Sequence, residues 1–199
     1  AAYGMASVAS IAGDALKPHV KALIPRLYRS TFDPNVLVRD SMRHIWTILV
    51  DDQREVLHEH ASDIVKLLNK DMTRQQWRVR ESAALAMSDI LQSIDWIDMK
   101  DMFETILVCC FRVMDDVKES VALAGQSLSR SIMSLSVRLT DPQSNKSKDS
   151  KEFLSVLFPV LMNQGMNSNV SSIKAFSIRM VAKLIKSAGK DTVQDSMEL

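Results

Sequence analysis

The chain has 199 residues, of which 46% are hydrophobic and 25% are charged, which is typical of a folded protein and argues against a disordered one. Its 25 lysines and arginines are balanced by 24 aspartates and glutamates, which excludes the overall cationic field that attracts nucleic acid. The longest apolar run, ILVCCF at residues 106–111, is too short to cross a bilayer, and no signal peptide opens the sequence. We therefore expect an intracellular protein without membrane insertion.

Glycine and proline number only five each, and runs of β-branched residues are few, so the sequence predicts an all-α fold. In chain order, residues 1–13 resemble the second helix of a unit whose first helix is absent. Four complete helix pairs are then expected at residues 14–52, 53–93, 94–139 and 151–189.

The first helix of each pair carries its own signals. In the second pair, an apolar stripe recurs at helical spacing at Leu57, Ala61, Ile64 and Leu68. Prolines stand at nearly the same register in the first and fourth pairs, in LIPRL and LFPVL. Because a proline inside a helix removes a hydrogen bond and kinks it, the sequence suggests bent first helices.

The second helix of each pair repeats one apolar pattern, with steps of four, three and four residues. This spacing is that of one buried helix face. The four copies are Val38, Met42, Ile45, Leu49; Val79, Ala83, Ala86, Ile90; Val117, Val121, Ala124, Leu128; and Ile173, Ser177, Met180, Leu184, the last with one polar member.

A polar segment, TDPQSNKSKDS at residues 140–150, lengthens the interval between the third and fourth copies. It has no apolar side chain, so we interpret it as an inserted, solvated loop. It is either a regulated or partner-binding loop, with serines among lysines, or a plain flexible insertion.

A four-residue motif opens each second helix: VRDS, VRES, VKES and the degenerate IKAF. We expect its valine to be a core residue, its acid to favour the positive end of the helix dipole, and its serine to admit a close neighbouring helix. The basic residue suggests a tertiary partner, such as an acid or carbonyl of the adjacent unit. A solvated side chain covering apolar surface and direct partner binding remain alternatives. These basic residues are the candidate structural or interface positions Arg39, Arg80, Lys118 and Lys174.

A helix pair of about forty residues is the length of a HEAT or an armadillo repeat, and two helices per unit with a proline in the first favour HEAT. One pair cannot bury its apolar faces alone. The sequence therefore predicts a HEAT-type α-solenoid of about four complete repeats and a leading half. Neither end carries a polar capping repeat, so we expect a single segment of a larger protein, packed against neighbouring repeats of the parent chain.

No motif for catalysis, cofactors or metals is found. His58 and His60 in HEH lack a third ligand, and we expect them on an exposed helix face. The adjacent Cys109 and Cys110 are expected to be buried free thiols. The glycines are scattered singly, and no serine lies in a nucleophile elbow, so we predict neither an enzyme nor a bound cofactor.

Large apolar side chains are expected mainly in the core. Trp46, Trp77 and Trp96 are either core residues or interface anchors. Methionines on the helical stripes are interpreted as core fillers, including Met87, Met114, Met162 and Met180.

Four longer stretches resemble the proteasome adaptor and scaffold family, a group of very long HEAT-repeat proteins. They are LIPRLYRSTFDPNVLVRDSMRHIW, WRVRESAALAMSDIL, FRVMDDVKESV and MNSNVSSIKAFSIRMVAKLIKSAG, and the likeness covers most of residues 1–189. The last ten residues, KDTVQDSMEL, do not clearly follow the family.

The resemblance implies a non-enzymatic scaffold that binds the 26S proteasome, bridges its particles and tethers it to endomembrane compartments, in the cytoplasm and nucleus. The alternative is another HEAT scaffold, such as a nuclear transport receptor or a phosphatase regulatory subunit. HEAT units often form a ladder from an aspartate and an arginine six residues later. Only Asp33 and Arg39 have that spacing here, so a continuous ladder is not predicted.

Overall fold

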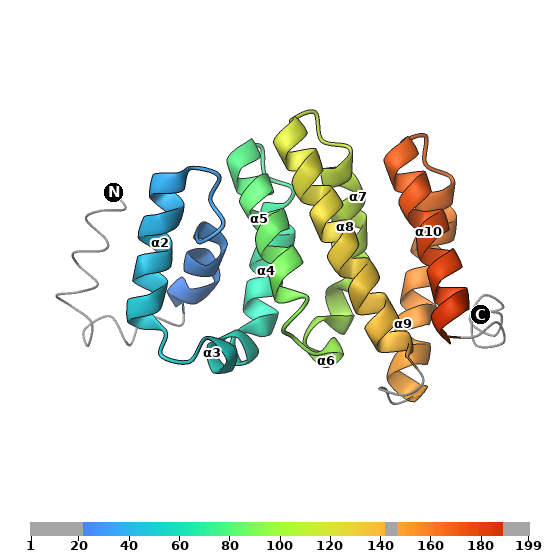
Figure 1. Ribbon diagram of the computed structural model, residues 1–199, viewed down its shortest axis with the longest axis horizontal. Helices are drawn as coiled ribbons and strands as arrows, with labels where there is room; N and C mark the ends of the chain where they lie inside the picture. Colours follow the sequence, from blue (N-terminus) through green and yellow to red (C-terminus); the bar gives the residue numbers. More distant parts are fainter. Residues whose placement is uncertain (1–21, 142–146, 189–199) are drawn as a thin grey trace. The chain divides into compact units, whose positions relative to one another are not determined.

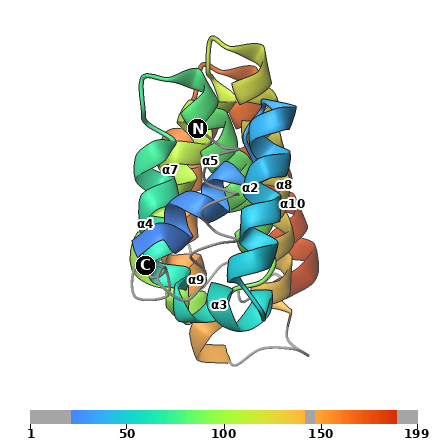
Figure 2. The ribbon, with the colours of Figure 1, turned by 90° about the vertical axis from the view of Figure 1, so that its left-hand side faces the viewer.

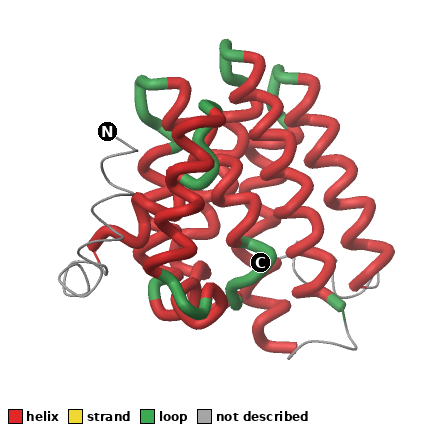
Figure 3. Tube along the Cα trace, turned by 60° about the vertical axis from the view of Figure 1, so that its left-hand side comes forward, coloured by secondary structure: helices red, strands yellow, loops and turns green. Residues whose placement is uncertain are grey.

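The structure, a computed structural model, describes residues 22–141 and 147–188, and every regular element within them is a helix (Figure 3). The predicted all-α fold is therefore confirmed for these residues. None of their helices is long and apolar enough to cross a membrane. The chain divides into two compact units, the first ending at Ile94 and the second beginning at Asp95, and each is described by itself.

The first unit contains two helix pairs in its described residues. The first pair joins the helix over residues 22–30 to α2 (Val36–Leu49). The second pair joins α3 (Gln53–Glu59) and α4 (Ala61–Asp71) to α5 (Trp77–Ile90), and α4 and α5 pack side by side (Figure 1).

The first helix of the second pair is broken, whereas the sequence suggested one continuous helix. It ends at Glu59, and His60 adopts φ −108° and ψ 9° before α4 begins. The predicted stripe is nevertheless confirmed, because it continues across the break with all its members at most 2% exposed: Leu57, Ala61, Ile64 and Leu68.

The second unit contains two further pairs. Short helices α6 (Trp96–Met99) and η1 (Lys100–Met102) precede α7 (Phe103–Met114) and α8 (Glu119–Thr140). The last pair joins α9 (Ser147–Val160) and the π-helix η2 (Leu161–Met166) to α10 (Ser171–Ala188). Figure 2 shows α8 and α10 in one layer and α7 with α9 in the other, and α8 contacts α10 as α7 contacts α9.

A change of helix type accompanies one of the two prolines. Pro159 lies inside α9, which ends one residue later and continues as η2. A proline has no N–H to donate, and π-helical turns arise where the regular hydrogen-bond pattern is interrupted. Pro25 lies within the helix over residues 22–30, whose type does not change.

Two glycines allow close helix packing in the second unit. A Cβ on Gly125 of α8 would lie 2.7 Å from the Met114 backbone nitrogen and 2.8 Å from the Val113 carbonyl carbon. The Cys110 thiol lies 3.7 Å from the Gly125 carbonyl oxygen in the same contact. A Cβ on Gly165 of η2 would collide with the side chain of Ser177. The backbone of α8 therefore contacts the α7 backbone at Gly125, and the backbone of η2 contacts the Ser177 side chain of α10 at Gly165.

The polar loop predicted at residues 140–150 is shorter than expected. Thr140 is the last residue of α8, and residues 147–150 already belong to α9. The Ser150 hydroxyl donates to the Leu139 carbonyl at 2.6 Å, which ties the beginning of α9 to the end of α8. The other residues of the loop, the leading half unit at 1–13 and the last ten residues lie wholly or mainly outside the described ranges.

Candidate functional site

The motif arginines of the first unit bind carbonyls of the turn before their own helix. Nη1 of Arg39 lies 3.3 Å from the Asp33 carbonyl oxygen. Nη1 of Arg80 donates to the carbonyls of Arg74 and Gln75, at 2.8 and 2.7 Å. In both helices the arginine reaches the residue six positions earlier. These bonds lie within one helix pair, whereas the sequence suggested a partner in the adjacent unit.

The motif lysines of the second unit occupy different places. Lys118 is the N-cap of α8, and its backbone N–H donates to the Asp116 carboxylate at 2.9 Å. Lys174 lies inside α10 with its side chain exposed. The four motif positions therefore do not form one structural class.

The motif valine is not a uniform core residue. Ile173 is buried, Val38 and Val79 are half-buried, but Val117 is 100% exposed, so the prediction is wrong for Val117. The reason is that α8 begins two residues later, at Glu119, which leaves Val117 in the preceding turn.

The motif acid also differs between copies. Glu119 is the first residue of α8, where the helix dipole favours a negative charge. Asp40 and Glu81 are each the fifth residue of their helices, beyond the turn in which that effect acts. The dipole explanation therefore applies only to the third copy.

The motif serine of α5 is part of a polar network. Ser82 is fully buried, accepts a hydrogen bond from Nη1 of Arg29 at 2.9 Å and donates to the Val79 carbonyl at 3.1 Å. The sequence predicted only that its small size admits a neighbour. It also fixes an arginine from the first helix pair onto the second.

The centre of this network is a carboxylate shared by two guanidinium groups. Asp71 at the end of α4 is 6% exposed, and its Oδ2 lies 3.1 Å from Nε of Arg29. The Nε–H of Arg29 does not point along this line, so the contact is an ion pair and not a hydrogen bond. Nε of Arg74 donates to the other oxygen of Asp71 at 3.3 Å.

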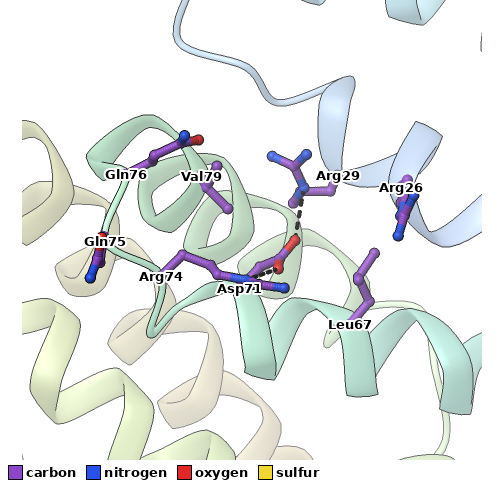
Figure 4. Close-up of a pocket in the computed structure, with 8 residues that line it drawn as sticks. All are labelled: Arg26, Arg29, Leu67, Asp71, Arg74, Gln75, Gln76 and Val79. Atoms are coloured by element: carbon purple, nitrogen blue, oxygen red, sulfur yellow. Dashed lines mark hydrogen bonds and ion pairs between the residues drawn. The ribbon is translucent and has the colours of Figure 1, made fainter.

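These groups line an open cleft of about 530 Å³ between the two helix pairs of the first unit. Figure 4 shows Arg29 and Arg26 projecting from the 22–30 helix toward α4 and the turn before α5. Three arginines, one aspartate, two glutamines and two apolar residues form the lining: Arg26, Arg29, Arg74, Asp71, Gln75, Gln76, Leu67 and Val79. We take this cleft as the candidate functional site.

A second ion pair joins the same helix pairs. Nη2 of Arg78 donates to Oδ1 of Asp33 at 2.9 Å, and the same oxygen accepts the N–H of Asn35 at 2.8 Å. The six-residue spacing pointed from Asp33 to Arg39, whereas the aspartate carboxylate binds an arginine of the following pair. Sequence reasoning missed Arg78, Arg29 and Asp71, because no local spacing signals a contact between successive pairs.

The next residues are the two histidines of the HEH motif and the two adjacent cysteines. His58 is exposed as expected, but His60 is buried at the break between α3 and α4, so that expectation is wrong for His60. Cys109 and Cys110 are buried free thiols, as predicted. Burial raises the pKa of both thiols; the charge of Arg112 opposes the rise at Cys109, and Cys109 adds to it at Cys110. Neither thiol is therefore a ready nucleophile at neutral pH.

The tryptophans divide between core and surface. Trp46 is 8% exposed and packs against Tyr28, while Trp96 is 5% exposed and packs edge-on against Phe103 and Phe153. Trp77, at the first position of α5, is 40% exposed. The core interpretation holds for two of them, and Trp77 lies on the surface beside the turn that lines the cleft.

Helix pairs with buried apolar stripes, joined in the first unit by polar contacts between its two pairs, define the chain as an all-α protein of the HEAT-repeat type. It is 38% identical over 189 residues to the human proteasome adapter and scaffold protein ECM29, covering 95% of the chain and 10% of that protein. The resemblance found in the sequence is thus confirmed: this chain is a homologue of a segment of the ECM29 proteins.

Two other relatives extend the likeness. The chain is 32% identical over 169 residues to proteasome component ECM29 of Saccharomyces cerevisiae, covering 83% of the chain and 9% of that protein. It is 26% identical over 211 residues to the Drosophila melanogaster ECM29 homologue, covering 95% of the chain and 11% of that protein. The chain thus spans about a tenth of the length of these relatives. No protein-family model and no solved structure matches it.

Proposed function

We propose that this chain is a segment of a proteasome-associated scaffold and acts by binding proteins. The observation that carries the proposal is its similarity along 95% of its length to a human protein named as a proteasome adapter and scaffold. An adapter needs surfaces that bind other proteins and does not need to catalyse a reaction, so we propose that this segment is non-enzymatic. The whole protein would bridge or tether the 26S proteasome inside the cell, in the cytoplasm and nucleus and at endomembranes.

The outward faces of the second helices support a binding role. Leu37 on α2 is 75% exposed, and Ile178 on α10 is 52% exposed. Large apolar side chains at such exposure are available to neighbouring repeats or to partner proteins. The arginine-lined cleft adds a charged surface of a different kind in the first unit.

Affinity purification of the full-length protein that contains this chain tests the proposal. We expect proteasome subunits in stoichiometric amounts. Cross-linking through the exposed lysines of the segment, including Lys66, Lys70 and Lys183, then localises the contact. Recovery of a transport cargo or a phosphatase in place of the proteasome would overturn the proposed function. Cross-links to the proteasome from other parts of the protein, with none from this segment, would remove this chain from the interface.

A further inference from the structure

The arginine-lined cleft has an excess of positive charge that the acidic side chain in its lining does not neutralise. Its lining contains three guanidinium groups and one carboxylate, although the whole sequence has a formal net charge of only +1. Asp71 pairs with Arg29 and with Arg74, which leaves the charge of Arg26 without a counterion in the lining. A local excess of positive charge on a nearly neutral protein attracts anionic groups.

Several donors of the cleft remain available. The guanidinium of Arg26 makes no hydrogen bond or ion pair with another described residue, and the Nη groups of Arg74 likewise have no partner within residues 22–141 and 147–188. The side chains of Gln75 and Gln76 are exposed at the rim. A guanidinium presents its N–H groups as a planar fork that fits a carboxylate through two parallel hydrogen bonds.

The cleft is also held in shape before any ligand arrives. Arg29 is fixed by Asp71 on α4 and by Ser82 on α5, so its position is set by two helices at once. Arg80 binds the carbonyls of Arg74 and Gln75 and so fixes the turn that carries two lining residues. Binding to such a preorganised site loses less conformational entropy than binding to a mobile surface.

We propose that this cleft binds an acidic peptide segment of a partner protein through its aspartate or glutamate carboxylates. A peptide places single charges several ångströms apart, and this matches a lining whose arginines come from the 22–30 helix and from the turn before α5. A compact phosphate dianion would concentrate its charge beside the Asp71 carboxylate, which disfavours it. Nucleic acid requires a longer run of cationic contacts than the near-neutral chain provides. The inference rests on the proposed function, because it assigns the partner segment to a proteasome subunit.

A double variant tests the cleft without disturbing its anchored network. Arg26→Glu with Gln75→Glu changes two exposed lining residues and leaves Arg29, Asp71 and Arg74 intact. The matched control is Gln53→Glu with Arg54→Glu at the beginning of α3 in the same unit, where both residues are exposed and the charge change is identical. Thermal unfolding of both variants checks that each remains folded.

The first measurement is fluorescence anisotropy of a labelled oligoglutamate peptide, with oligoglutamine of equal length for comparison, on the full-length protein. We expect the wild type and the control variant to bind oligoglutamate and not oligoglutamine. We expect the cleft variant to bind oligoglutamate at least about tenfold more weakly. The proposal would be overturned if the wild type did not bind the peptide, or if both variants lost affinity equally. It would also be overturned if single-stranded RNA displaced the labelled peptide more effectively than unlabelled oligoglutamate does.

The second measurement is proteasome capture by the same three proteins. Reduced capture by the cleft variant, with normal capture by the control, supports the cleft as the docking site. Undiminished capture by the cleft variant overturns this assignment and leaves the proposed function standing. Failure of the wild type to capture the proteasome defeats the proposed function, whereas the peptide measurement reports on the cleft independently.

Discussion

A phenol and a carboxylate meet between the two helix pairs of the first unit. The Tyr28 hydroxyl donates to Oδ2 of Asp89 at 2.7 Å, and the Tyr28 ring lies 5.5 Å from that of Trp46. Burial, and then the charge of Asp89, raises the pKa of Tyr28 well above its ordinary value of about 10. The phenol therefore keeps its proton in the folded protein at a pH where the unfolded chain releases it.

This difference predicts an alkaline loss of stability. Above about pH 10 the unfolded state binds fewer protons than the folded state, so the free energy of unfolding falls as pH rises. We expect Tyr28→Phe to lower the free energy of unfolding by about 1–2 kcal/mol at neutral pH, because a hydrogen bond to a carboxylate is lost. The variant should also lose less stability across the alkaline range. Urea unfolding at neutral and alkaline pH measures both effects, and equally steep alkaline losses in the two proteins would contradict this account.

Individual side chains show where sequence reasoning stops. The burial of Cys109 and Cys110 follows from their residue type and was predicted. The exposure of Val117 was not predicted, because periodicity finds a helix face but does not fix the residue at which the helix begins. The pairing of Arg29 with Asp71 depends on how two successive helix pairs pack, which no local pattern encodes.

The α7–α8 contact predicts a costly small substitution. Alanine normally stabilises a helix relative to glycine by about 1 kcal/mol. At Gly125, however, the added methyl group would meet the α7 backbone on Val113 and Met114, which cannot rotate away as a side chain can. We expect Gly125→Ala to lower the free energy of unfolding by about 1–2 kcal/mol, since overpacking outweighs the propensity gain.

Urea unfolding measures this effect, with Ser134→Ala on the exposed side of the same helix as control. The control should change stability by no more than about 0.5 kcal/mol. A Gly125→Ala protein as stable as the wild type would mean that α7 moves away from α8 at negligible cost.

The buried faces of the helices were predicted more accurately than the residues at which the helices begin and end. The stripe from Leu57 to Leu68 is buried throughout, because helical periodicity reports burial directly. The break at His60 has no proline or glycine to announce it. The polar residues 147–150 looked like loop, yet they form the first turn of α9, because composition does not separate a solvated helical turn from a solvated loop.

The charge balance of the chain predicts its behaviour toward nucleic acid. Because the formal net charge is only +1, we expect no binding of single-stranded RNA in an electrophoretic mobility-shift assay at low salt. A basic HEAT-repeat protein of similar size serves as the positive control. RNA binding that weakens steeply with added salt would contradict this expectation.

The class of function came from resemblance, since the chain contains no motif that specifies a reaction. The pairing of helices could be deduced from four matched apolar patterns. This fold provides surfaces for binding, but it does not identify the protein that binds them. The cleft could not be predicted, because its arginines come from the first helix of one pair and the turn of the next. Its residues became recognisable only when the packing of the pairs was known.

The anchoring of Arg29 has a mechanical consequence. This one side chain of the first pair is attached to the first helix of the second pair through Asp71 and to the second helix through Ser82. A torsional displacement of one pair against the other would strain both attachments together. This joint should therefore be torsionally stiff, and an applied load should be transmitted through it with little twist.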